Sequence, residues 1–145
     1  PKAASPVDKI FICILATPDL PGAVDWYKRT LGLDEGGTYT IEYTMLNKAF
    51  ALPDGTQHTL TMVQAGRTPI AEVDAYPAKA TPRAHPPGML PPGNALVTLA
   101  VNSLDRPGLD WIMPPVVRDG ALYGGRRAGT VRGPAGELLE LVEVG

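Results

Sequence analysis

The sequence contains an internal repeat, and this feature constrains the fold more than any other. The apolar run at 12–17 aligns with the run at 96–101 at an offset of 84 residues. Further along, each half has a Pro-Gly pair followed by Asp-Trp, at 21–26 and at 107–111. The ends of the halves also match, because a Pro-x-Gly turn precedes an apolar run in both. An ordered series of matches predicts two structurally equivalent halves.

Each half has the pattern of a strand, a helix and three further strands. In the first half, a strand at 10–16 is apolar on both faces, and a helix follows it between an N-cap at Asp19 and a stop at Gly32. Three further strands are expected at 38–45, 48–52 and 58–63. In the second half, a strand at 95–101 precedes a short helix at 107–112, and strands are expected at 116–117, 127–132 and 138–144. The sequence predicts an α+β domain made of a leader at 1–8, a βαβββ module at 9–66, a proline-rich strap at 67–92 and a second βαβββ module at 93–145.

The composition excludes several classes of protein. The chain has 145 residues and a net charge of −2, which is typical of one domain and offers no basic surface for nucleic acid. It contains no apolar run of the roughly 20 residues that a membrane helix needs, so we expect no membrane partner. The single cysteine, Cys13, excludes an internal disulfide. Without a secretory signal pattern, the expected compartment is the cytoplasm.

Several motifs make the chain resemble the vicinal oxygen chelate superfamily, which includes glyoxalase I, bleomycin-resistance proteins and extradiol dioxygenases. They are the Thr-Pro-Asp-Leu entry at 17–20, the Trp-Tyr helix that ends with Leu-Gly-Leu at 31–33, and the closing segment VRGPAGELLELVE at 131–143. The resemblance implies that two tandem βαβββ modules form a cupped mixed sheet around the site, the glyoxalase/bleomycin-resistance/dioxygenase fold. It also implies a homodimer, since such cups are often assembled from two subunits.

The resemblance further implies where a metal would be held, at the first and fourth strands of each module. The corresponding positions here are Ile12, Thr61, Leu96 and Glu140. Isoleucine and leucine offer no lone pair to a metal, and one carboxylate does not hold a transition metal against water. We therefore expect no cofactor and no metal. A divalent metal held by His58, Glu140 and Glu42 remains an alternative.

Glu140 is the leading candidate for catalysis. Strand alternation places it on the opposite face from Leu139 and Leu141, and therefore in the cup that the resemblance implies. An apolar cup disfavours the charged carboxylate, which makes Glu140 a candidate general base. Tyr123 and Arg127 are the expected stabilisers of an oxyanion.

The expected substrate contacts come from the strands that line the cup. His58 has the opposite strand parity to Thr61, so its side chain is expected on the helix side of the sheet or at the rim of the cup. Glu42 is expected beside Glu140 or at the rim. The full set of expected contacts is Ile10, Ile12, Ile14, Thr61, Leu96, Thr98, His58 and Glu42.

Three functions are compatible with these residues. The first is a metal-independent isomerase or lyase that acts on a small apolar or aromatic carbonyl compound, with Glu140 as the general base. The second is a non-catalytic protein that binds a drug-like small molecule, as the resistance members of the family do. The third is a metal-dependent glyoxalase- or dioxygenase-like enzyme with atypical ligands. Most members of the family are enzymes, so the resemblance favours an enzyme.

Overall fold

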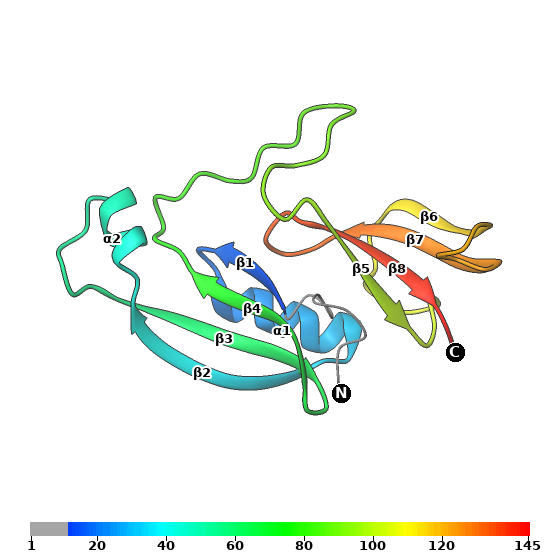
Figure 1. Ribbon diagram of the computed structural model, residues 1–145, viewed down its shortest axis with the longest axis horizontal. Coiled ribbons are helices and arrows are strands. Elements are labelled where there is room, and N and C mark those ends of the chain that lie inside the picture. The colour runs from blue at the N-terminus through cyan, green and yellow to red at the C-terminus, as the bar shows by residue number, and fades with distance from the viewer. Residues whose placement is uncertain (1–11) are drawn as a thin grey trace, which may run out of the picture.

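Two four-stranded sheets with the same strand order form the protein (Figure 1). The computed structural model describes residues 12–145, so the leader at 1–8 and the expected contact Ile10 lie outside the described residues. The first sheet has the order β1 (Cys13–Thr17), β4 (Thr68–Ala75), β3 (Gln57–Ala65) and β2 (Asp34–Glu42). The second has the order β5 (Leu96–Val101), β8 (Leu138–Glu143), β7 (Arg126–Arg132) and β6 (Trp111–Arg118). In both sheets the first and fourth strands of the module pair in parallel and all other pairs are antiparallel. The repeated order confirms the predicted α+β fold with two equivalent sheets.

Helix α1 (Leu20–Leu31) begins and ends where the sequence predicts. The Asp19 carboxylate accepts a hydrogen bond from the Gly22 amide at 3.0 Å, which caps the first turn. Gly32 has a φ of 68°, and this left-handed conformation ends the helix at little steric cost. The buried side of the helix carries Ala23, Val24, Tyr27 and Leu31.

The hydrophobic core joins α1 to both sheets. Its buried members include Leu15, Val63 and Val73 from the first sheet and Val131, Leu139 and Leu141 from the second. Side chains alternate along each strand, so the residues between these core positions point to the other side of the sheet. We call that other side the open face; on β1, β4, β5 and β8 it carries Ile14, Ala16, Glu72, Asp74, Leu96, Thr98 and Glu140.

The structure corrects the expected first module. The segment at 48–52 is not a strand, because helix α2 (Thr44–Ala49) includes its first two residues and a turn follows the helix. The run at 58–63 belongs to the third strand, β3, and the fourth strand, β4, lies inside the segment expected to be strap. The Pro53–Gly55 turn leads into β3, whereas the β3–β4 hairpin turns at Gly66, which has a φ of 58°. The first module therefore extends through Ala75.

The structure also corrects the second module, in which the expected helix at 107–112 is absent from the described residues. Gly108 has a φ of 79°, which is incompatible with an α-helix, and β6 begins at Trp111. The loop between β5 and β6 is anchored instead by the Leu104 side chain, which packs in the core and is 2% exposed. The connection from β4 to β5, residues 76–95, has no helix or strand and crosses between the two sheets (Figure 1). Neither helix within residues 12–145 has the length and apolar character that crossing a bilayer requires.

Candidate functional site

Glu140 lies on the open face of the second sheet and accepts hydrogen bonds from two hydroxyl groups. It is 8% exposed, and in the register of the sheet it stands between Thr98 of β5 and Thr130 of β7. The Thr98 hydroxyl donates to Glu140 Oε2 at 2.8 Å, and the Tyr123 hydroxyl donates to Oε1 at 2.8 Å. The structure thus brings together three residues that the sequence selected for the site.

Tyr123 reaches Glu140 from the loop between β6 and β7. Its hydrogen bond to Glu140 is the main cause that raises the pKa of the Tyr123 hydroxyl, so the phenol stays neutral near pH 7. The Arg118 guanidinium carbon lies 5.8 Å from the centre of the Tyr123 ring, within the range of a cation–π contact. Tyr123 is therefore placed as a neutral hydrogen-bond donor beside a carboxylate.

The first module carries an equivalent pair that the sequence analysis missed. Glu72 is opposite Ile14 in the β1–β4 register, as Glu140 is opposite Thr98 in the β5–β8 register, and Ile14 and Thr98 are 84 residues apart (98 minus 14). The Tyr43 hydroxyl donates to Glu72 Oε1 at 3.3 Å. Tyr43 precedes α2 in the β2–β3 connection, and Tyr123 lies in the corresponding β6–β7 connection. Each module therefore presents a tyrosine–glutamate pair on its open face.

Asp74 adds a second carboxyl group to the pair in the first module. It lies two residues beyond Glu72 on the same face of β4 and is only 4% exposed. Its Oδ1 atom is buried and has no hydrogen-bond partner among residues 12–145. Burial, followed by the negative charge of Glu72, raises the pKa of Asp74 to about 6. Burial, followed by the charges of Asp74 and Glu72, likewise raises the pKa of Tyr43 to about 12.

These residues were missed because the fourth strand was placed too early in the sequence. The Pro53–Gly55 turn was matched to Pro134–Gly136, which made 58–63 the expected counterpart of β8. In the sequence of β4, the apolar residues Ala71 and Val73 alternate with the acidic residues Glu72 and Asp74, and the structure places Ala71 and Val73 in the core. That alternation, following the Gly66-Arg67 turn, was the signal that identifies the strand.

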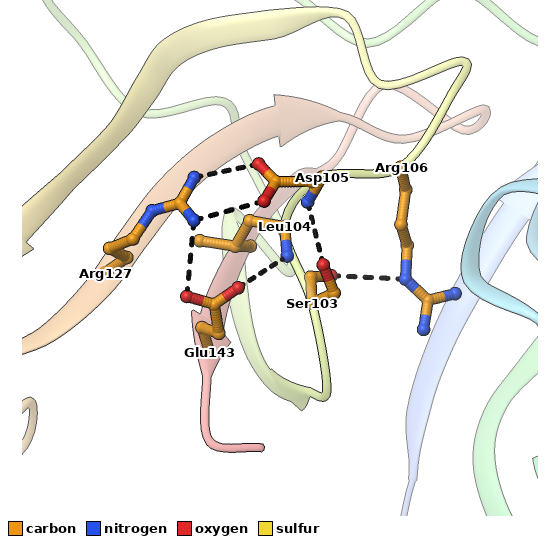
Figure 2. A network of polar contacts seen from close by, with 6 residues as sticks. All are labelled: Ser103, Leu104, Asp105, Arg106, Arg127 and Glu143. Atoms are coloured by element: carbon orange, nitrogen blue, oxygen red, sulfur yellow. Dashed lines mark hydrogen bonds and ion pairs between the residues drawn. The ribbon is translucent and has the colours of Figure 1, made fainter.

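Arg127 is separated from Glu140 by the sheet itself. Its β7 neighbours on the same face are Gly129 and the core residue Val131, whereas Thr130 lies on the face of Glu140. Figure 2 shows Arg127 between two carboxylates, with Nη2 3.0 Å from Asp105 Oδ1 and Nη1 3.5 Å from Glu143 Oε2. This placement corrects the expected role of Arg127 beside an oxyanion.

Thr61 and His58 exchange the orientations that the sequence analysis expected. Thr61 is 2% exposed, and its hydroxyl lies 2.9 Å from that of Thr38; both residues line a pocket against α1 rather than the open face. His58 lies on the open face, where it is 7% exposed and its Nε2 is 2.7 Å from Asn47 Oδ1 of α2. The reason is register: Leu60 pairs with Asp74 and faces the open side, so odd-numbered β3 residues face the helix.

The remaining expected contacts lie along the open faces or at the rim. Ile14 is 49% exposed and Leu96 is 45% exposed, so both present apolar surface to solvent. Ile12 is half-buried and immediately precedes β1. Glu42 lies at the end of β2 and accepts a hydrogen bond from the Gly55 amide at 3.0 Å, so it holds the turn at 53–55 rather than contacting Glu140.

The polar groups around the two glutamates do not fit a divalent metal. Within the part of the chain that the structure describes, no three His, Cys, Asp or Glu side chains are placed to hold one ion. Glu140 is met by two hydroxyl groups that donate hydrogen bonds to it, and Glu72 is opposite an isoleucine. At Glu140 these neighbours stabilise the carboxylate by hydrogen bonding, and at Glu72 the nearby Asp74 adds only one further carboxyl group, fewer ligands than the three or four protein side chains of a zinc site.

Comparisons with solved structures give the same fold over nearly the whole chain. A glyoxalase family protein from Bacillus cereus superposes with a TM-score of 0.64 at 17% identity, covering 99% of this chain and 98% of that chain. A superfamily member from Sphaerobacter thermophilus gives 0.55 at 19% identity, with 95% and 98% covered. A lactoylglutathione lyase from Agrobacterium tumefaciens gives 0.54 at 14% identity, with 96% of each chain covered.

Comparison with family models adds a match in sequence. No curated protein matches the chain. The family model described as Glyoxalase/Bleomycin resistance protein/Dioxygenase superfamily matches residues 9–141, which include both tyrosine–glutamate pairs. The chain therefore belongs to the glyoxalase/bleomycin resistance protein/dioxygenase superfamily.

Proposed function

We propose that the protein is a metal-independent isomerase or lyase that acts on a small apolar or aromatic carbonyl compound, with Glu140 as the general base. The observation that carries the proposal is the buried Glu140 carboxylate with the neutral Tyr123 hydroxyl bonded to it, on a face that also exposes the apolar side chains of Leu96, Met113 and Val116. A base and a neutral hydrogen-bond donor side by side are the two groups that enolisation of a carbonyl compound requires.

The proposed reaction begins with removal of a proton from the carbon next to the carbonyl group. Glu140 accepts this proton, and the electrons of the broken C–H bond move into the carbonyl to form an enolate. Once Glu140 is protonated and neutral, the Tyr123 hydroxyl leaves Oε1 and donates its one hydrogen bond to the enolate oxygen, where negative charge develops. Thr98 keeps the second carboxylate oxygen in place. Return of the proton to another carbon completes an isomerisation, and loss of a leaving group from the neighbouring carbon completes an elimination.

The proposed substrate is apolar because the open face around Glu140 offers few other polar groups. Leu96 lies on the neighbouring strand, and Met113 and Val116 of β6 are 38% and 47% exposed on the same face. Burial of such side chains against a small ring or alkyl group is favourable by about 25 cal/mol per Å² of apolar surface.

Exposed apolar side chains on both open faces also support a homodimer. Ile14, Tyr39 and Ile41 of the first sheet are between 37% and 56% exposed, in addition to the residues of the second sheet. A second copy of the chain would cover these side chains and exclude water from both glutamates. Light scattering at micromolar concentration tests this proposal, because it separates a species of twice the chain mass from a monomer.

Hydrogen exchange tests the catalytic proposal without knowledge of the natural substrate. The protein is incubated in deuterated water with a panel of small aromatic and aliphatic ketones, and deuterium incorporation next to the carbonyl is measured. Glu140→Gln is expected to abolish the exchange that the native protein catalyses. Glu35→Gln is the matched control, since Glu35 is an exposed partner of Lys28. Exchange that survives Glu140→Gln contradicts the role of Glu140.

The second candidate is a non-catalytic small-molecule binding protein, favoured by the breadth of the exposed apolar surface. Under this function Glu140→Gln changes the affinity for an apolar ligand and no ketone in the panel exchanges deuterium. The metal-dependent alternative has less support, because the donor groups do not fit an ion. Elemental analysis of the purified protein tests it directly.

A further inference from the structure

The β4–β5 connection folds back onto the second module through Arg83. Arg83 Nε donates to the Ala135 carbonyl at 3.3 Å, and Nη1 donates to the carbonyls of Pro92 and Asn94 at 2.6 and 3.1 Å. Asn94 in turn donates to the Ile14 carbonyl at 2.9 Å. These bonds hold the connection against both modules.

The folded connection closes a pocket of about 520 Å³ that is separate from Glu140. The connection, the end of β1 with the start of α1, and the β7–β8 turn at Pro134–Gly136 form its walls. Most of the lining is apolar and includes Ala16, Pro18, Ala80 and Pro82. Arg83 and His85 add basic groups to it. This volume lies within the range of small-molecule sites.

Two basic side chains line this pocket, and a third lies against one of them. Arg83 and His85 line it, and Arg132 of β7 places its Nη1 2.6 Å from His85 Nδ1. Partial desolvation and the charges of Arg132 and Arg83 lower the pKa of His85, so a neutral ring accepts this hydrogen bond. Among the ion pairs of residues 12–145, neither Arg83 nor Arg132 has a carboxylate partner.

The acids near the pocket already have partners. Asp19 lines the pocket, but its Oδ1 accepts the Gly22 amide at the start of α1. Glu137 follows the β7–β8 turn and is fully buried, where it accepts from the Tyr27 hydroxyl and from the Ala135 amide. The positive charges of Arg83 and Arg132 both act on His85 and neither is paired with an acid, so an anion bound here would balance charge that is otherwise uncompensated.

We propose that this pocket binds a small molecule with an apolar body and one oxyanion group, a carboxylate or a phosphate, that pairs with Arg132 and Arg83. The apolar body packs on the alanine and proline side chains of the wall. Arg132 is the specific contact, since it bonds to no backbone carbonyl within the described part of the chain, whereas Arg83 also holds the connection in place. The proposal is independent of the function assigned to Glu140.

The test uses benzoate, phenyl phosphate and benzyl alcohol as probes with the full chain. Binding is followed by the amide NMR shifts of Ala135 and Gly136, which line the pocket. Benzoate or phenyl phosphate is expected to shift these amides with saturation, and the tighter of the two identifies the preferred oxyanion. Arg132→Gln is expected to weaken that binding by about tenfold or more, the loss of a charge-assisted hydrogen bond. Arg67→Gln, which removes an exposed positive charge from the β3–β4 turn, is expected to leave it unchanged.

Three results would overturn the proposal. They are no saturable shift with either anion, equal binding of benzyl alcohol, and unchanged anion binding by Arg132→Gln. Glu140→Gln separates this site from the proposed function, because it removes ketone exchange while the benzoate shifts at Ala135 and Gly136 persist.

Discussion

Glu72 and Glu140 occupy the same position in the two modules, and each accepts a hydrogen bond from a tyrosine in the connection between the second and third strands. Their surroundings have diverged. Glu140 also receives the Thr98 hydroxyl, whereas Ile14 stands at the equivalent position beside Glu72. Two residues further on, Asp74 in the first module corresponds to Val142 in the second. One module therefore holds a carboxylate stabilised by two hydroxyl groups, and the other holds two neighbouring carboxyl groups.

The carboxyl pair in the first module predicts a pH-dependent stability. Because the folded-state pKa of Asp74 is about 6, above its ordinary value of 3.8, its stabilising contribution is full below about pH 4 and is lost as the pH rises through 6. Glu72→Gln removes the neighbouring charge and is expected to lower the pKa of Asp74. Carboxyl carbon NMR titration measures this shift, and urea unfolding at pH 4 and pH 7 measures the stability.

Two controls make that prediction specific. Asp74→Asn is expected to remove this part of the pH dependence, and Glu35→Gln, at an exposed ion pair, is expected to leave it unchanged. A titration of Asp74 below pH 4.5 in the native protein contradicts the predicted coupling.

Tyr27 and Glu137 form a buried contact between α1 and the second module. Tyr27 is 1% exposed and Glu137 is fully buried, so the Tyr27 hydroxyl compensates part of the cost of burying the carboxylate. Tyr27→Phe is expected to reduce the free energy of unfolding by about 1.5–3 kcal/mol. Denaturant unfolding measures the change, with the exposed Tyr39→Phe as the control. Equal stability of the two variants would show that Glu137 is satisfied without Tyr27.

Arg127 connects the 103–105 loop to the end of strand β8 (Figure 2). The Arg127 side chain is 37% exposed, so solvent screens both of its ion pairs. Arg127→Gln is expected to leave the stability nearly unchanged, because Glu143 still accepts the Leu104 amide at 3.0 Å. A double-mutant cycle with Asp105→Asn measures the coupling. A large coupling would show that solvent does not screen the pair.

Gly129 provides the space in which the Trp111 ring lies against β7. A Cβ atom at Gly129 would lie 2.6 Å from a carbon of that ring, closer than any stable contact. Gly129→Ala is expected to destabilise the protein by about 1–3 kcal/mol through this overlap. Thermal unfolding measures the effect, and Trp111→Leu in the same chain is expected to recover part of it. Additive losses in the double variant would contradict the overlap as the cause.

The repeat was sufficient to predict the first strand, the first helix and the last two strands. These elements depend on local patterns: the Asp19 cap, the left-handed Gly32, and the alternation that places Leu139 and Leu141 opposite Glu140. The same alternation predicted that Glu140 faces away from the core. Local signals suffice in these segments because burial and local conformation agree.

Local sequence patterns predict the wrong strand where two turn signals compete. Both Pro53–Gly55 and Gly66-Arg67 are good turns, and only the pairing of β3 with β4 shows which one is the hairpin. Choosing the earlier turn predicts the wrong face of the sheet for Thr61 and His58. It also places Glu72 and Asp74 in the strap instead of in a strand. The Pro107-Gly108 pair, matched to the Pro-Gly start of α1, forms a loop because Gly108 is left-handed.

The sequence by itself determined the family, the duplicated architecture and the face of the sheet on which Glu140 lies, since repeats, caps and strand alternation are encoded by neighbouring residues. Tertiary structure decided which side chains meet: Tyr43 with Glu72, Tyr123 with Glu140, and Arg132 with His85. Each of these contacts joins residues from different elements. Strand register and loop path set such contacts, and both depend on packing across the whole core rather than on local sequence.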